Sequence, residues 1–205
     1  MQADKMGVSR CIQLKKGVLP GLLLIPDITG FTKYIAAADL QYSQVNIALL
    51  LEAILENNKL GLQVSEIEGD AILFYSFEND HSVDEIIDQC FSMHRAFHHQ
   101  LKKIIATDCS CGACALLGEL SLKFILHYGE MGSVMINDFC KLYGAEVIVA
   151  HRLLKNELSM KEYILATENF FAQYGQNSMQ IFELENKSQG IEEIRTINYR
   201  YLKFD

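Results

Sequence analysis

The chain has 205 residues, the size of one ordinary domain, and half of them are hydrophobic, which is enough for a sizeable core. The chain has 26 acidic residues and 18 Lys and Arg residues, which gives a formal net charge of −8. Because the sequence also contains no block of basic residues, we expect no nucleic-acid partner. No apolar run is long enough to span a bilayer as a helix, so we expect a cytoplasmic protein without a membrane partner.

Residues 1–17 are polar and aperiodic, and we expect them to form an extension of unreadable role before a single domain at 18–205. The apolar run at 22–25 predicts a strand buried on both faces, which the turn at Thr29 and Gly30 ends. Helical spacing follows over residues 31–59, with Ser43 as the expected start and Asn57 near the expected end.

Further along, residues 62–68 and 71–77 predict a hairpin through a Gly69-Asp70 turn, and residues 80–103 predict a helix. The remaining expected elements are a strand pair at 120–126 and 134–136, a helix at 143–155, and strands at 163–166, 179–184 and 194–204. Hairpins and helices in this order are typical of an α+β fold, a mainly antiparallel sheet with helices packed on it.

Four short segments carry a family resemblance in their order and spacing. Residues Asp27-Ile28-Thr29-Gly30-Phe31-Thr32 resemble the first signature of class III adenylate and guanylate cyclase catalytic domains, and Glu68-Gly69-Asp70-Ala71 resembles the second. Residues 124–130 resemble the strand that ends in His-x-Gly-Glu, and residues 143–153 resemble the helix with the transition-state residues. The resemblance, to a divergent bacterial-type branch, implies the ferredoxin-like nucleotidyl cyclase fold.

Cyclising a nucleoside triphosphate requires the 3′-hydroxyl to attack the α-phosphorus while pyrophosphate leaves, and hard cations bound by carboxylates can support that step. The resemblance implies that Asp27, Asp70 and the backbone of Ile28 hold two Mg²⁺ or Mn²⁺ ions, and that Thr32 contacts the phosphates together with Phe31 and Gly30. The alternative is that Asp27 caps the following helix and Asp70 makes a turn.

The resemblance assigns base reading to Glu66 and Lys141. Guanylate cyclases commonly have glutamate at the first position, whereas lysine at the second departs from the usual aspartate or cysteine. Arg152 matches the transition-state arginine, which one subunit contributes to the metal site of the other. Ile148 falls where active cyclases have a ribose-orienting asparagine, and isoleucine cannot hydrogen-bond a sugar. A surface glutamate and a solvated helix arginine are the alternatives.

Cys109, Cys111 and Cys114 form a compact cluster outside the cyclase plan. Three thiolates so close could bind Zn²⁺ with a fourth ligand from His98, His99 or Cys140, although one cluster without a matched pair also fits reduced cysteines in a small-residue turn. His127 ends an apolar strand and is expected to be structural.

The sequence therefore leaves several functions open. The first is metal-dependent binding of a purine nucleoside triphosphate by a head-to-tail homodimer, with conversion to a cyclic nucleotide and pyrophosphate. The second is a catalytically degenerate module with a regulatory, nucleotide-binding or dimerisation role, which Ile148 and Lys141 favour. The third is a cyclase-like scaffold whose cysteine loop holds a metal.

Overall fold

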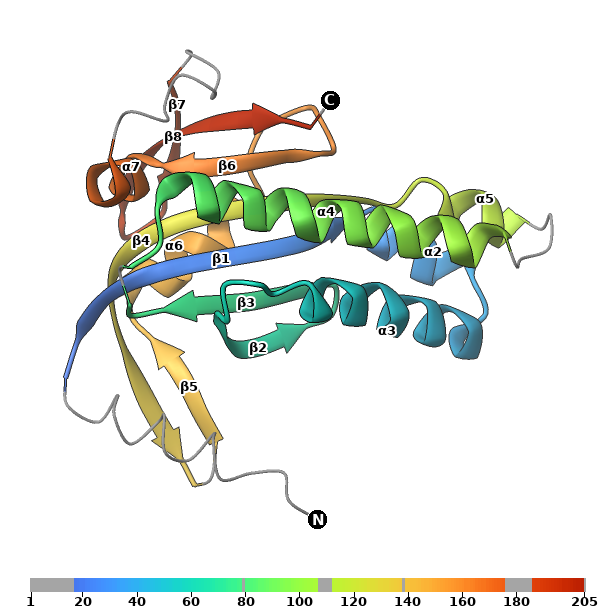
Figure 1. The fold of residues 1–205 in the computed structure, drawn as a ribbon, viewed down its shortest axis with the longest axis horizontal. Coiled ribbons are helices and arrows are strands. Elements are labelled where there is room, and N and C mark those ends of the chain that lie inside the picture. Colours follow the sequence, from blue (N-terminus) through green and yellow to red (C-terminus); the bar gives the residue numbers. More distant parts are fainter. Residues whose placement is uncertain (1–16, 79, 107–111, 138, 176–185, 205) are drawn as a thin grey trace.

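The computed structural model describes residues 17–78, 80–106, 112–137, 139–175 and 186–204, the side chains of 112–114 and 139 excepted. An eight-stranded sheet runs in the order β2-β3-β1-β4-β6-β8-β7, and β5 pairs with an extension of β4 (Figure 1). The strands are β1 (Leu19–Thr29), β2 (Gln63–Glu68), β3 (Ala71–Ser76), β4 (Ser121–Ile136), β5 (Phe139–Tyr143), β6 (Tyr163–Thr167), β7 (Lys187–Ile191) and β8 (Arg195–Lys203). Only the β4–β6 pair is parallel among the pairings of this sheet, which confirms the predicted α+β class.

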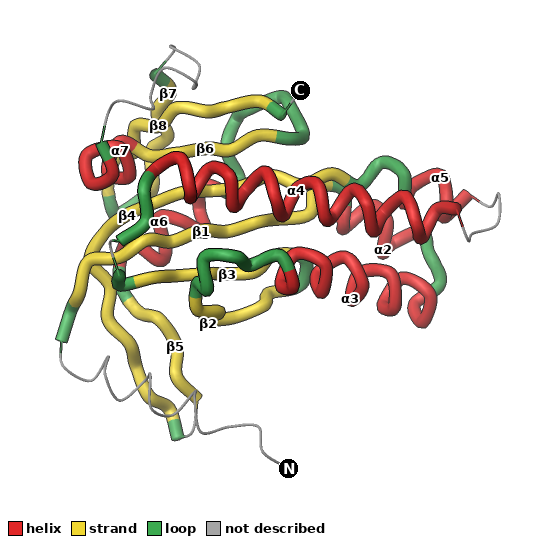
Figure 2. The backbone as a smooth tube through the Cα atoms, viewed as in Figure 1, coloured by secondary structure: helices red, strands yellow, loops and turns green. Residues whose placement is uncertain are grey.

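Helices cover both faces of the sheet, and the strand β1 is buried between them (Figure 2). Leu22 and Leu24 pack on the face covered by α3 (Leu40–Glu56) and α4 (Val83–Ala106), which lie side by side in Figure 1. Leu23 and Ile25 pack on the opposite face, against α6 (Ala145–Leu153). Because side chains alternate along a strand, Asp27 lies on the α6 face.

The expected helical region at 31–59 forms two helices rather than one. The first is α2 (Phe31–Ala37), and α3 then begins after Asp39, whose carboxylate accepts a hydrogen bond from the Tyr42 amide. The predicted start at Ser43 is therefore wrong, and its hydroxyl instead donates to the Leu40 carbonyl inside the helix. Asp39 is therefore the N-cap of this helix, although serine and aspartate are comparably good capping residues.

The expected strand pair at 120–126 and 134–136 is also wrong, because both segments belong to the single long strand β4. Gly129 and Gly132 break the apolar pattern in the sequence but stay extended, since they pair with Gly21 of β1 and Tyr143 of β5. The predicted helix at 143–155 correspondingly starts later, at Ala145. Figure 1 shows the β4–β5 hairpin extending away from the body of the sheet.

Other elements divide into those that the sequence predicted and those that it missed. The hairpin around Gly69 and the inward face of α4 are confirmed, and the buried α4 residues include Ile86, Cys90, Met93 and Phe97. The short helices α5 (Gly112–Leu117) and α7 (Glu168–Tyr174) and the strand β7 were not predicted. The predicted strand at 179–184 lies outside the described residues, as does the N-terminal extension except Gly17.

Replacing Gly21 tests how tightly β1 and β3 approach one another. An added Cβ would lie 2.5 Å from the Ser76 carbonyl oxygen, so the backbone would have to move. We expect Gly21→Ala to lower the free energy of unfolding by about 1–3 kcal/mol in urea titrations. Gly190→Ala in β7 is the control, since a Cβ there meets nothing within 4 Å. Equal midpoints for the two variants would contradict this account.

Candidate functional site

The aspartates Asp27 and Asp70 meet at one end of the sheet. Asp27 lies near the end of β1, opposite Ala71 of β3 and Lys123 of β4. Asp70 lies in the β2–β3 turn, where Gly69 takes a φ of 61°, and its carbonyl accepts a hydrogen bond of 3.1 Å from the Ile28 amide. The strand register therefore fixes these aspartates beside one another, although they are far apart in the sequence.

The electrostatics of this acidic pair are set by burial and by one nearby lysine. Burial and, after it, the negative charge of Asp27 raise the pKa of Asp70 to about 6, against the opposing effects of a backbone hydrogen bond and of Lys123. The Lys123 ammonium lies 3.2 Å from Asp27 Oδ2 and donates a hydrogen bond to the Leu154 carbonyl. With both carboxylates ionised and the lysine protonated, the three groups have a formal net charge of −1, which is favourable for binding a cation.

The turn between β1 and α2 places the rest of the first signature beside the acidic pair. Gly30 has a φ of 92°, a conformation that glycine adopts without strain, and α2 begins at Phe31. The side chain of Thr32 is exposed and Phe31 packs partly against the core.

A second group of side chains surrounds a pocket of about 510 Å³ between the β2 edge and α6. Its lining contains Glu66 and Lys141, which the sequence assigned to base reading, and Arg152, which it assigned to transition-state binding. Ile148, at the position of the missing ribose-orienting asparagine, lines the same pocket. Lys141 donates to Glu66 Oε2 at 2.9 Å, and this hydrogen bond raises the pKa of Lys141. His151 Nε2 lies 3.6 Å from the other carboxylate oxygen of Glu66.

The exposure of the α6 residues defines the mouth of this pocket. Ile148 is 51% exposed, a large value for an isoleucine, and Arg152 follows one turn later with an exposed side chain. Of the described residues that line the pocket, none is Asp27 or Asp70. The structure thus collects the predicted site residues into two separate groups within one chain.

His127 belongs to a buried network, as its expected structural role requires. Its Nδ1 lies 2.8 Å from the Thr167 hydroxyl and its Nε2 lies 2.7 Å from the Glu146 carboxylate, which also accepts a bond from Arg195 at 2.6 Å. Burial alone would raise the pKa of Glu146, but the hydrogen bonds from His127 and Arg195 lower it to about 2.

This network explains why the third position of the His-x-Gly-Glu signature is a glycine. A Cβ on Gly129 would lie 2.5 Å from Cγ of Glu146, so only glycine lets that side chain cross the strand to His127. Sequence analysis missed Glu146, Arg195 and Lys123. The first two are 49 residues apart and no local pattern joins them, whereas the register of Lys123 opposite Asp27 depends on the β1–β4 pairing.

The expected zinc site at the cysteine loop has no support in the described part of the chain. Cys109 and Cys111 lie outside the described residues, and Cys114 is described only by its backbone in α5. Cys140 is disulfide-bonded, so it is not a thiolate available as a fourth ligand. His99 is exposed on α4.

Comparisons with solved structures identify the class of fold. An adenylyl cyclase, CyaB from P. aeruginosa, superposes with a TM-score of 0.68 at 13% identity over 92% of this chain and 96% of that one. The guanylyl cyclase Cya2 superposes with a TM-score of 0.67 at 12% identity, over 92% of this chain and 94% of that chain. The guanylate cyclase domain of RhGC from Catenaria anguillulae, in complex with GTP, superposes with a TM-score of 0.65 at 15% identity. The superposition covers 91% of this chain and 98% of that chain. This chain therefore has the class III nucleotidyl cyclase fold.

The sequence family is narrower than the fold. The chain belongs to the family described as "Protein of unknown function (DUF2652)", whose model matches residues 47–163. It is also 32% identical over 123 residues to uncharacterized protein Rv2561/Rv2562 of Mycobacterium tuberculosis (strain ATCC 25618 / H37Rv). That match covers 60% of this chain and 57% of the mycobacterial protein, so it spans little more than half of the relative's length. None of the helices in the described ranges has the length and apolar character needed to cross a membrane.

The raised pKa of Asp70 predicts a pH-dependent effect on stability. Folding raises this pKa from 3.8 to about 6, so the protonated carboxyl stabilises the fold below pH 4 and that contribution is lost as the pH rises through 6. Asp70→Asn removes the unfavourable charge and should raise the free energy of unfolding of metal-free protein by about 1 kcal/mol at neutral pH, allowing for solvent screening.

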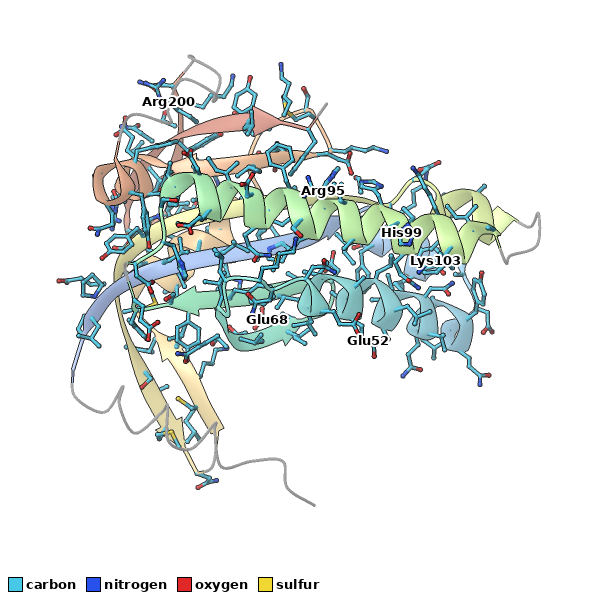
Figure 3. All side chains as sticks on the ribbon, in the orientation of Figure 1. Glu52, Glu68, Arg95, His99, Lys103 and Arg200 are labelled. Carbon is cyan, nitrogen blue, oxygen red and sulfur yellow. The ribbon has the colours of Figure 1, made fainter. Side chains whose placement is uncertain are left out.

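Urea titrations near pH 7.5 and pH 4.5 measure this difference, which should shrink at the lower pH. Glu52→Gln, at an exposed residue labelled on α3 in Figure 3, serves as the control for removing one carboxylate. A lower stability of Asp70→Asn at both pH values would contradict the electrostatic account.

Proposed function

We propose that two copies of this chain bind a purine nucleoside triphosphate with Mg²⁺ or Mn²⁺ ions and convert it to a cyclic nucleotide and pyrophosphate. The observation that carries the proposal is the convergence of Asp27 and Asp70, from separate signatures, at one end of the sheet. Solved neighbours of this fold are described as adenylyl and guanylyl cyclases, and one is in complex with GTP.

The acidic pair has the donor set that a hard divalent cation requires. Carboxylate oxygens are the preferred protein ligands of Mg²⁺. Burial is the main cause of the raised pKa of Asp70 and repulsion from Asp27 the second, and a cation between the two carboxylates would relieve that repulsion. Bound cations would supply positive charge to the phosphate oxygens and activate the 3′-hydroxyl. Asp27, Asp70 and the Ile28 backbone would hold them, and Gly30, Phe31 and Thr32 would border the phosphates.

The pocket beside α6 supports a purine base as the other part of the ligand. Its volume of about 510 Å³ lies within the range usual for small-molecule sites, and most of its lining is apolar. The Glu66 carboxylate could accept hydrogen bonds from guanine N1 and N2, and Lys141, which now pairs with Glu66, could donate to a base oxygen. This polar pair makes guanine the favoured base.

In a head-to-tail homodimer, the acidic pair of one subunit would meet the pocket residues of the other in a composite site. Exposed apolar residues support such a dimer. Val134, Met135, Ile136, Tyr143 and Ile148 are all at least 37% exposed, and they lie on the β4–β5 hairpin or at the rim of the pocket. An apolar surface of this kind commonly marks a protein interface. In the dimer, Arg152 of one subunit would stabilise charge on the phosphates held at the acidic pair of the other.

Binding without turnover is the second candidate function, and Ile148 is the observation that favours it. An isoleucine at the pocket mouth leaves the ribose without the amide that orients it in active cyclases. A chain with the acidic pair and without that amide could bind nucleotide and act through its dimer state alone.

Incubation of the pure chain with GTP or ATP and Mn²⁺ distinguishes the candidates. We expect cyclic product from the wild type, and a loss of at least about 100-fold with Asp27→Ala because the cation loses a ligand. Glu52→Gln should match the wild type, since its side chain is exposed on α3. Equal background from wild type and Asp27→Ala would exclude the enzymatic function, and calorimetric binding without product would establish the second candidate.

Mixing inactive variants tests whether each site draws on both subunits. Asp27→Ala damages the metal group and Arg152→Ala damages the pocket group, so in a head-to-tail heterodimer one site loses both groups and the other keeps both. Random pairing should restore about a quarter of wild-type activity, since half of the dimers are mixed and each has one intact site. No recovery after subunit exchange would mean that each site lies within one chain.

A further inference from the structure

Two histidines and one glutamate meet on the opposite side of the molecule from α6. His94 and His98 lie one turn apart on α4, so their side chains point to the same side of that helix. Glu162 immediately precedes β6 and lies against both of them. Their ligand atoms, one from each residue, all lie within 4.8 Å of one another.

The distances in this cluster are close to those of a tetrahedral metal site. Ligands at about 2.0–2.1 Å from a tetrahedral ion lie about 3.3 Å from one another. His94 Nε2 is 3.3 Å from Glu162 Oε1, which already matches, while His98 Nε2 is 2.7 Å from the same oxygen and would move outward by about half an ångström. Side-chain rotation is enough for that change.

The cluster is preorganised by contacts that do not use the ligand atoms of the histidines. The ring of His94 stacks on Phe204 with centroids 3.9 Å apart and an interplanar angle of 2°. The Leu122 amide donates to Glu162 Oε1 at 3.2 Å, which holds the carboxylate in place. Fixed ligand orientation of this kind is what supporting contacts provide in metal sites.

His94 Nε2 is the atom that most needs a partner. Within the described part of the chain it is buried and makes no hydrogen bond, although it faces the glutamate. A buried polar atom that makes no hydrogen bond is costly, and a cation bound between this nitrogen and the Glu162 carboxylate would satisfy both.

We propose that His94, His98 and Glu162 bind a divalent transition metal, with Zn²⁺ the favoured ion. Imidazole nitrogen with one carboxylate is a common zinc donor set and suits Mg²⁺ poorly. The site is separate from Asp27 and Asp70, because α4 covers the face of the sheet opposite α6. The ion would join α4 to the start of β6 and leave a fourth position for water.

Calorimetric titration of the reduced, chelator-treated full chain with ZnCl₂ tests the proposal. We expect one saturable site in the wild type, and at least roughly tenfold weaker binding for each of His94→Ala, His98→Ala and Glu162→Gln. His99→Ala is the matched control, because His99 lies on the same helix, is labelled in Figure 3 and has an exposed side chain. Zinc should also raise the melting temperature of the wild type and of His99→Ala.

The cysteine loop supplies the competing explanation, and a further variant separates it. Cys109→Ser/Cys111→Ser/Cys114→Ser should bind Zn²⁺ as tightly as the wild type if the histidine cluster holds the ion. Zinc binding that is lost in this triple variant and kept in His94→Ala would overturn the proposal, as would a wild type that binds no zinc. Glu162→Gln preserves the shape of the side chain. If the circular dichroism of this variant matches that of the wild type, its weaker zinc binding results from the lost carboxylate and not from misfolding.

Discussion

The register of β1 between β3 and β4 is the constraint on which the rest of the site depends. It places Asp27 opposite Ala71 on one side and Lys123 on the other, and it brings the Ile28 amide to the Asp70 carbonyl. A shift by one residue would turn Asp27 toward α4 and send Ile28 to the α6 face. The buried apolar side chains on either side of β1 oppose such a shift, because each alternate residue packs against a different helix layer. Core packing therefore fixes the acidic pair.

Much of this arrangement could be predicted from the sequence because its signals are local. The apolar run before Asp27, the Gly69-Asp70 turn and the apolar stripe of α4 each indicate their own structure, and the structure confirms all three. The continuous strand β4 was missed because Gly129 and Gly132 look like breaks until their partners on β1 and β5 are known. The helix start at Asp39 was missed because Ser43 is also a good capping residue, and only the hydrogen bond to the Tyr42 amide distinguishes them.

Residues brought together over long sequence distances were beyond prediction. Arg195 reaches Glu146, which also bonds His127, from β8. Glu162 reaches His94 and His98 from before β6, and no pattern in the sequence joins either group. His98 was considered only as a partner for the cysteine loop, and His94 was not considered at all. In each case the sheet order, with β6 between β4 and β8, decides which side chains meet.

Ile148 links the proposed chemistry of the pocket to the proposed dimer. A half-exposed isoleucine contributes little to the fold of a single chain, yet burying it against a second copy would contribute about 1–2 kcal/mol on each side of a symmetric interface. An asparagine at the same position would gain a hydrogen bond to ribose and lose most of that apolar contact. In the proposed dimer this arrangement would strengthen association and weaken sugar positioning, so that the limit on the proposed turnover would lie at α6 and not at Asp27 and Asp70.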